Sequence, residues 1–101
     1  MTSVELRVRV LLTLQVALLG RVTANMRAVL VSWTEKEIWI NFRFDQPASP
    51  QEIELVSEVE TEVISHLPDH LPQCQIDAIS CSNKLDINLG EVLVFHRFEN
   101  S

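Results

Sequence analysis

The segment from residue 49 to residue 68 reads SPQEIELVSEVETEVISHLP and contains both the start and the stop signals of a helix. Ser49 is suited to cap the first free backbone N–H groups, and a proline follows at the first helical position. Glu52 comes three residues after the cap and completes a capping box. Pro68 cannot continue a helix. The sequence therefore predicts a helix from Ser49 to Leu67.

Apolar residues recur in this helix at steps of three and four, which places them on one face. They are Ile53, Val56, Val59, Val63 and Leu67, with Leu55 and Ile64 at the margins. We expect this face to pack on the rest of the protein. Glu54, Glu58 and Glu62 recur at steps of four on another face and form what we call the acidic stripe. Like charges at this spacing slightly destabilise an isolated helix.

Charge is unevenly distributed along the 101 residues, whose net charge is −6. Residues 1–44 carry six Lys or Arg against three Glu, whereas residues 45–101 carry two against eleven Asp or Glu. Between Arg43 and Lys84 there are eight acidic residues and no basic one. This distribution disfavours nucleic acid or an anionic membrane as the partner of that surface and favours a basic protein.

The length predicts a single domain over residues 1–101, because the chain can build one hydrophobic core but not two. Cys74 and Cys81 are too few for a disulfide framework, so we expect reduced thiols and a cytoplasmic protein. The basic residues before the apolar run from Val10 to Gly20 superficially resemble a secretory signal. However, Arg21 lies where a cleavage region normally lacks charge, and the run is too short to span a membrane. We therefore expect this run to be part of the fold.

The first twenty residues allow two interpretations. Val4–Val10 alternates strictly between apolar and polar residues, which is typical of a strand, whereas Leu11–Leu19 is rich in Leu and Ala and is followed by a glycine suited to end a helix. We favour one helix from Ser3 to Leu19, capped by Thr2 or Ser3, with a strand over its first half as the alternative.

The rest of the chain predicts four strands. Met26–Trp33 and Ile38–Phe44 are rich in β-branched and aromatic residues and are joined by a polar turn, as in a hairpin. Strands are also expected at Gln73–Ser82 and Val92–Phe98. The loop between these two, Ser82–Gly90, offers Leu85, Ile87 and Leu89 as cover for the sheet.

The order α-β-β-α-β-β predicts an α+β fold, with a four-stranded, mainly antiparallel sheet and two helices packed on one face. Alternation along the second strand divides its side chains between the two sheet faces. Ile38, Ile40, Phe42 and Phe44 should pack under the helices, and Trp39, Asn41 and Arg43 should lie on the other face, which is expected to be unprotected. An unprotected sheet face is a possible contact surface for a second copy of the chain.

Catalytic and metal-binding signatures are weak. His66, His70 and Cys74 recur at steps of four and are residue types that zinc prefers, but Pro68 and Pro72 interrupt any helix that would align them. No Gly-x-Ser-x-Gly elbow or phosphate loop occurs. We therefore expect no cofactor, no metal and no enzyme activity. A metal-dependent hydrolase built on these three residues is the least favoured alternative.

The acidic stripe is the strongest candidate for a functional surface. Exposed helix faces usually mix both signs of charge, and no Lys interrupts this stripe, so we expect it to bind a basic protein. The alternative is a merely solvated helix face. Asp45 and Asp69 extend the acidic region. Trp39 is also a predicted contact residue, because tryptophan is enriched at binding hot spots and strand alternation turns this side chain away from the helices.

Five sequence segments together resemble small bacterial immunity proteins of contact-dependent growth inhibition and related polymorphic toxin systems. They are Leu18-Leu19-Gly20, Asn25-Met26-Arg27-Ala28-Val29, Phe42-Arg43-Phe44-Asp45, Glu58-Val59-Glu60-Thr61-Glu62-Val63 and the closing Val92–Glu99. The resemblance spans nearly the whole chain and implies a cytoplasmic protein that binds one cognate toxin domain, often a nuclease, and blocks it. The contact residues rest on the charge argument alone. The alternative is a small homodimeric α+β domain without a toxin partner.

Overall fold

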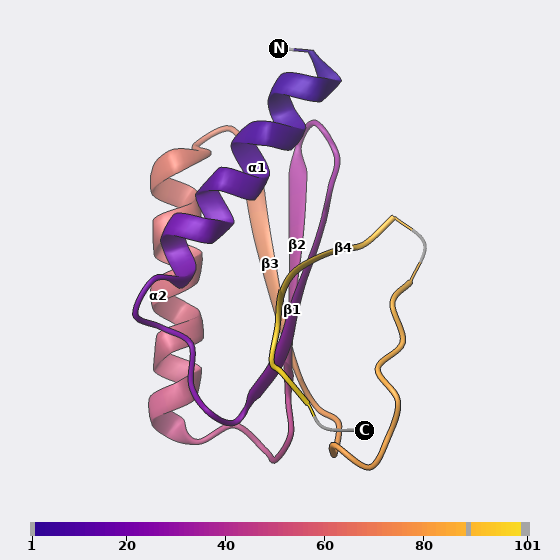
Figure 1. Ribbon diagram of the computed structural model, residues 1–101. Coiled ribbons are helices and arrows are strands. Elements are labelled where there is room, and N and C mark those ends of the chain that lie inside the picture. The colour runs from indigo at the N-terminus through magenta and orange to yellow at the C-terminus, as the bar shows by residue number, and fades with distance from the viewer. Residues whose placement is uncertain (1, 89, 100–101) are drawn as a thin grey trace.

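A computed structural model describes residues 2–88 and 90–99 and shows two helices and four strands within them (Figure 1). In chain order the elements are α1 (Ser3–Leu18), β1 (Met26–Trp33), β2 (Glu37–Phe44), α2 (Pro50–His66), β3 (Leu71–Ala78) and β4 (Val92–His96). The predicted α+β class and element order are confirmed. The third strand begins and ends earlier than predicted, and the fourth ends earlier.

The four strands form one mixed sheet in the order β3-β2-β1-β4. β1 pairs antiparallel with β2 and β4, whereas β2 and β3 are parallel. The parallel pair follows from the connection, because α2 carries the chain back along the sheet between β2 and β3. The hairpin of β1 and β2 is closed by the backbone N–H of Thr34, which donates to the carbonyl of Glu37 at 2.8 Å.

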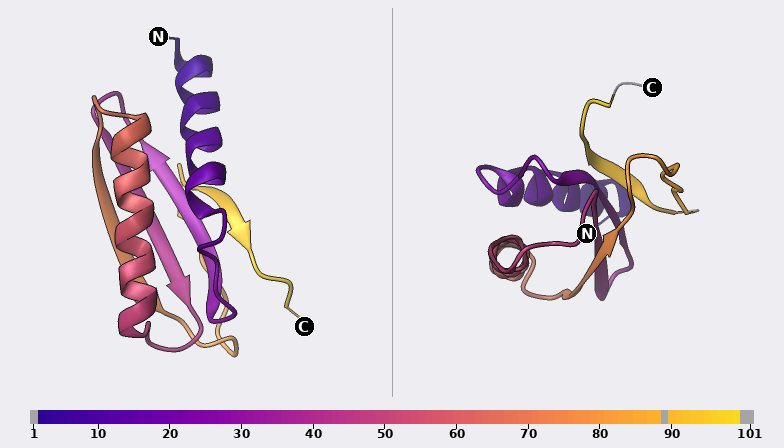
Figure 2. Two further views of the ribbon diagram at one scale, coloured as in Figure 1. Left: turned by 90° about the vertical axis from the view of Figure 1, so that its left-hand side faces the viewer. Right: turned by 90° about the horizontal axis from the view of Figure 1, so that it is seen from below.

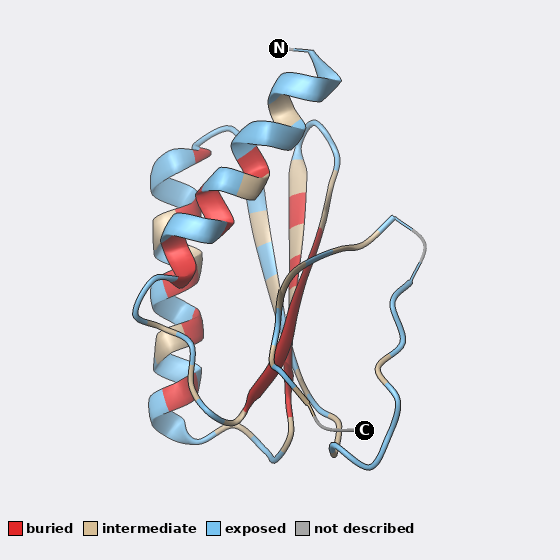
Figure 3. Ribbon diagram, in the orientation of Figure 1, coloured by how far each residue is buried: buried red, intermediate tan, exposed pale blue. Residues whose placement is uncertain are grey.

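Both helices pack on the same face of the sheet (Figure 2). Between the helices and the sheet lies the hydrophobic core, which Figure 3 shows as buried residues on the facing sides of these elements. The four apolar residues of β2 that were expected under the helices are all fully buried there, namely Ile38, Ile40, Phe42 and Phe44. The predicted orientation of this strand is therefore confirmed.

The first segment is helical throughout, so the strand alternative for its first half is wrong. Thr2 caps α1, because its hydroxyl accepts from the backbone N–H of Glu5 at 3.1 Å. Gly20 follows the helix with φ of 73°, a conformation that L side chains rarely adopt. The alternation that indicated a strand arises because α1 carries apolar residues on its outer side as well as toward the core.

The capping box of α2 forms as predicted. The hydroxyl of Ser49 accepts from the backbone N–H of Glu52, and the carboxylate of Glu52 accepts from the backbone N–H of Ser49. The predicted apolar face is correct except at Ile53, which is 50% exposed. Glu52 points inward instead and is buried, because it lies four residues before Val56 and therefore on the same helix row. Its carboxylate accepts hydrogen bonds from Thr23 and Asn25, which fixes the loop before β1 onto α2.

The opposite sheet face is covered in part, which corrects the expectation that it is unprotected. Ala28 and Leu30 of β1 are buried there, whereas Gln73 and Gln75 of β3 and Leu93 of β4 are exposed. Residues 79–88, 90 and 91 lie on the side of the sheet away from the helices (Figure 2). The side chain of Arg43 is buried there and donates to the carbonyl of Asp86 at 3.4 Å, and the amide of Asn41 donates to the carboxylate of Glu91. Leu85 is half-buried, Ile87 is exposed, and the predicted cover by Leu89 lies outside the described residues.

Candidate partner-binding surface

The acidic stripe lies on the solvent side of α2, and a cation from another element compensates part of it. Arg21, in the loop after α1, places Nε 3.5 Å from Glu58 Oε1 and Nη2 3.8 Å from Glu62 Oε1. Its Nη1 donates to the carbonyl of Ala17, which orients the guanidinium. Glu54 is exposed and takes part in no ion pair within residues 2–88 and 90–99. The stripe therefore presents three carboxylates against one arginine.

Two other glutamates of α2 do not belong to this surface. Glu52 serves the capping box, and although burial raises its pKa, hydrogen bonds from Thr23, Ser49 and Asn25 leave the pKa below its usual range. Glu60 is half-buried beside Cys74 of β3. Glu52 therefore stabilises the fold, and Glu60 lies toward β3 rather than on the solvent side of α2.

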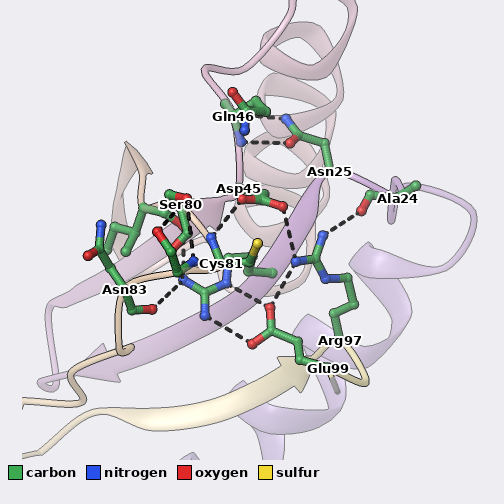
Figure 4. Close-up of polar contacts among 12 residues, drawn as sticks. Ala24, Asn25, Asp45, Gln46, Ser80, Cys81, Asn83, Arg97 and Glu99 are labelled. Atoms are coloured by element: carbon green, nitrogen blue, oxygen red, sulfur yellow. Dashed lines mark hydrogen bonds and ion pairs between the residues drawn. The ribbon is translucent and has the colours of Figure 1, made fainter. Parts of the chain in front are cut away.

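Asp45 follows β2 and belongs to a polar network at the end of the sheet (Figure 4). It accepts from the backbone N–H of Cys81 at 2.8 Å and from Arg97 at 3.3 Å. The hydrogen bond from Cys81, followed by the one from Arg97, holds the pKa of Asp45 below its usual range. Because both oxygens have partners within the chain, Asp45 connects the loop after β3 to the segment after β4.

Arg27 of β1 joins the same network through Glu99, although it was not among the predicted site residues. Its side chain is 3% exposed and forms an ion pair with Glu99. The remaining nitrogen, Nη1, donates to the carbonyls of Ile79, Ser80 and Asn83 at 2.9–3.2 Å. Arg97 also binds Glu99, at 2.9 Å, so two arginines share one carboxylate. An arginine in a strand next to apolar residues was the only sequence signal for this cluster.

The six predicted contact residues do not form one surface. Glu54, Glu58 and Glu62 share the outer side of α2, whereas Asp45 is engaged in the polar network. Asp69 is exposed in the turn after α2, beside a hollow that Ser3 and Leu6 of α1 also line. Trp39 is half-buried on the sheet face away from the helices, where it pairs with Ser32.

The three candidate metal ligands are engaged separately. The Nδ1 atom of His66 is 2.9 Å from the carbonyl of Glu62, and the Nε2 atom of His70 is 3.2 Å from the carbonyl of Thr34. Burial, followed by the nearby Glu60, raises the pKa of Cys74 to about 12, so its thiol is a poor source of the thiolate that metals bind. No group of three or more potential ligands converges in the described part of the chain.

The sequence model of the MafI2 immunity protein family matches residues 7–99, a range that includes all four strands and α2. The chain belongs to the MafI2 immunity protein family. No curated protein sequence matches it. The resemblance to immunity proteins of polymorphic toxin systems is thereby confirmed.

Membership in the MafI2 immunity protein family implies a toxin partner and directs attention to surfaces rather than to a catalytic cleft. Immunity protein families are generally non-enzymatic. Neither helix of the described chain has the length and apolar character needed to cross a bilayer. In this MafI2 protein the acidic stripe is a charged surface on which three carboxylates are paired with one arginine in the described part of the chain.

Proposed function

We propose that this MafI2 protein acts in the cytoplasm and neutralises a basic toxin domain, a nuclease, by docking the acidic stripe against it. The observation that supports this proposal is that Glu54, Glu58 and Glu62 lie along the solvent side of α2, where Arg21 is the only Lys or Arg that pairs with them in the described part of the chain. A nuclease must attract phosphates and therefore carries a basic substrate groove. Carboxylates placed in that groove would occupy the positions of the phosphates and exclude the substrate.

Charge also supports a role in rapid capture. With a net charge of −6, the protein attracts a basic domain over a distance, and complementary potentials raise association rates. Fast association suits an inhibitor that must act before a nuclease finds nucleic acid. No step in this proposal requires a cofactor, a metal or catalysis by the immunity protein.

The test compares two variants with the same change in net charge. In the first, Glu54, Glu58 and Glu62 are all replaced by Gln. In the second, the replacements are Glu5→Gln, Glu35→Gln and Asp86→Asn, which remove three exposed carboxylates outside α2. Stopped-flow association with the cognate toxin domain and rescue of growth on co-expression are the measurements.

The α2 variant should associate more slowly than the control variant at low salt, because the removed charges lie at the contact. The difference should narrow as salt rises, since the Debye length falls from about 10 Å at 0.1 M to about 3 Å at 1 M. Equal rates for the two variants would mean that only net charge matters and that the toxin does not dock on α2.

A further inference from the structure

β3 forms one edge of the sheet, with β2 on one side and no strand of the described chain on the other. The backbone N–H of Leu71 donates to the carbonyl of Lys36, just before β2, and the N–H of Ile79 donates to the carbonyl of Phe44. Because the backbone groups of successive residues point to opposite sides of a strand, the odd-numbered residues of β3 bond to β2. The outward N–H and C=O groups are those of Cys74, Ile76 and Ala78.

This edge of the sheet is open, whereas the other one is partly closed. No hydrogen bond within residues 2–88 and 90–99 reaches the outward backbone groups of β3. At the opposite edge, by contrast, Gln15 of α1 donates to the carbonyl of Val94 in β4 at 3.3 Å. Pro72 also points outward from β3 but has no N–H, so the row of free donors begins at Cys74. An unpaired row of this kind is a template for a further strand.

One flank of α2 runs along the open edge. Of the two helices, α2 is the one that packs over β3, and α1 lies toward β4 (Figure 2). The flank of α2 that faces α1 is marked by the pairing of Arg21 with the acidic stripe. The other flank is marked by Glu60, which is half-buried beside Cys74. Ile53 and Ile64 lie seven residues before and four residues after Glu60, and therefore on the same flank.

This flank and the open edge form an apolar surface with one carboxylate. Ile53 is 50% exposed, Ile64 is 45% exposed and Ile76 of β3 is 37% exposed. Ile76 faces the helices, because its neighbour in the register is Phe42, which is buried in the core. Glu60 makes no ion pair within the described residues. We call these four residues the ledge. A strand added to β3 would turn every second side chain toward the ledge.

The ledge fits a strand of a basic partner better than a second copy of this chain. α2 and β3 both lie between Arg43 and Lys84, a range with eight acidic residues and no basic one. A second copy would bring the same acidic elements to the edge, and like charges across an interface are unfavourable. A strand with apolar residues and a lysine or arginine on one side would cover the three isoleucines and pair with Glu60. Membership in the MafI2 family implies a toxin as that partner.

We propose that the toxin domain adds one of its own strands to the open edge of β3, with alternate side chains packed on the ledge. The inference rests on the proposed neutralisation of a basic toxin domain and specifies how that domain is held. In strand addition, main-chain hydrogen bonds provide affinity and the alternating side chains provide specificity. The acidic stripe lies on the adjoining solvent side of α2, so one toxin domain contacts both.

Hydrogen exchange measured by NMR tests the strand addition residue by residue. In the free protein, the backbone N–H groups of Cys74, Ile76 and Ala78 should exchange quickly, and those of Gln73 and Gln75 slowly, because only the latter two bond to β2. In the complex with the cognate toxin domain, exchange of the three outward groups should slow by about tenfold or more, since pairing protects them from water.

The exchange experiment separates this inference from the proposed docking of the acidic stripe. A complex in which the outward N–H groups of β3 exchange as fast as in the free protein overturns the strand addition and leaves docking through the stripe intact. Protection of the same groups in the free protein, increasing with protein concentration, would assign the edge to a second copy and also overturn the inference. A toxin domain that does not bind at all would overturn both proposals.

A pair of variants tests the ledge without a change in charge. In the first, Ile53 and Ile64 are both replaced by Gln, which should leave the fold intact because both residues are exposed and glutamine favours a helix. The Kd for the toxin domain should rise about tenfold or more, mainly through faster dissociation. The control replaces Val8 and Leu12 of α1 by Gln, at residues 52% and 61% exposed, and should bind as the wild-type protein does.

Salt distinguishes loss of the ledge from loss of the stripe. The weaker binding of the Ile53→Gln, Ile64→Gln variant should persist at 1 M salt, because the lost contacts are apolar, whereas the effect of removing the stripe carboxylates should narrow. Wild-type affinity in this variant overturns the proposal. An equal loss of affinity in the α1 control would also count against the ledge, because the effect would then not be specific to α2.

Discussion

Arg27 of β1 and Glu99 after β4 are joined by two parallel hydrogen bonds, from Nε to Oε2 at 2.7 Å and from Nη2 to Oε1 at 2.9 Å. This two-point geometry is the strongest form of an arginine–carboxylate contact, because both partners are charged and both are planar. Three carbonyls accept from Nη1, the remaining nitrogen of Arg27, so all three nitrogens of the buried guanidinium have acceptors. The pair therefore connects the loop after β3, the central strand β1 and the last described residues.

The pair predicts a loss of stability in acid. Hydrogen bonding to Arg27 lowers the pKa of Glu99 to about 2. Because the folded protein favours the ionised carboxylate, the contribution of the pair is complete above about pH 4.3, the ordinary glutamate value, and is lost as the pH falls toward 2. Glu99→Gln should unfold at lower urea concentration than the wild-type protein at pH 7, and the difference should shrink below pH 4.

Urea melts of both proteins at several pH values measure this difference. The control is Glu54→Gln, which removes an exposed carboxylate that has no ion pair in the described chain and should leave the acid dependence unchanged. A difference between Glu99→Gln and the wild-type protein that stays constant from pH 7 to pH 2 would contradict the assignment of the lowered pKa to this contact.

Packing on the inner face of α2 should dominate its contribution to stability. Val59→Ala removes two methyl carbons from the core and should cost about 1–3 kcal/mol, less than the roughly 2–5 kcal/mol typical of Leu or Ile truncations. Ile53→Ala removes more apolar volume but from an exposed position, and should cost within about 0.5 kcal/mol. If Ile53 were part of the packed face, denaturant melts would show a larger loss of stability for Ile53→Ala than for Val59→Ala.

Arg21 should slow the capture of a basic toxin. Arg21→Ala removes the only Lys or Arg that pairs with Glu58 and Glu62 in the described chain, which leaves both carboxylates freer to attract the toxin. The variant should therefore associate faster than the wild-type protein at low salt in stopped-flow experiments. The ion pairs of Arg21 lie at the protein surface, where such pairs contribute about 0–1 kcal/mol, and the loss of its hydrogen bond to the carbonyl of Ala17 adds to this cost. Slower association would indicate that Arg21 itself contacts the toxin.

The two cysteines should differ strongly in reactivity. Burial raises the pKa of Cys74 to about 12, whereas Cys81 is exposed. A thiol reagent at pH 8 should modify one cysteine per folded chain rapidly, and this reaction should disappear in Cys81→Ser. Cys74 should react only after unfolding in denaturant. Rapid modification of Cys74 in the folded protein would show that β3 opens readily from α2.

Local signals predicted the helices well because the chemistry that starts and ends them lies within a few residues. The capping box of Ser49 and Glu52 is such a case, since its partners are three positions apart. The error at Ile53 has a physical cause. Steps of three and four allow a wide apolar stripe, and the hydrogen bonds of Glu52 to Thr23 and Asn25 decided which residue of the first turn faces inward.

Long-range contacts were beyond sequence reasoning because their partners share no local pattern. Arg21 and Glu58 are 37 positions apart, and their contact depends on how the loop after α1 passes over α2. The acidic stripe was therefore predicted without its one cation. Likewise, Asp45 was interpreted as part of a binding surface, although the folded chain brings Cys81 and Arg97 to its two oxygens.

The distance along the chain between Arg27 and Glu99 also affects how this protein is made. The two residues are 72 positions apart, and a ribosome adds about 5–20 residues per second, so Arg27 is added to the chain several seconds before Glu99. β1 likewise lacks its neighbour β4 during this interval and exposes an unpaired strand edge. The nascent chain therefore exposes the free edge of β1 until residues 92–99 have left the ribosome and complete the sheet.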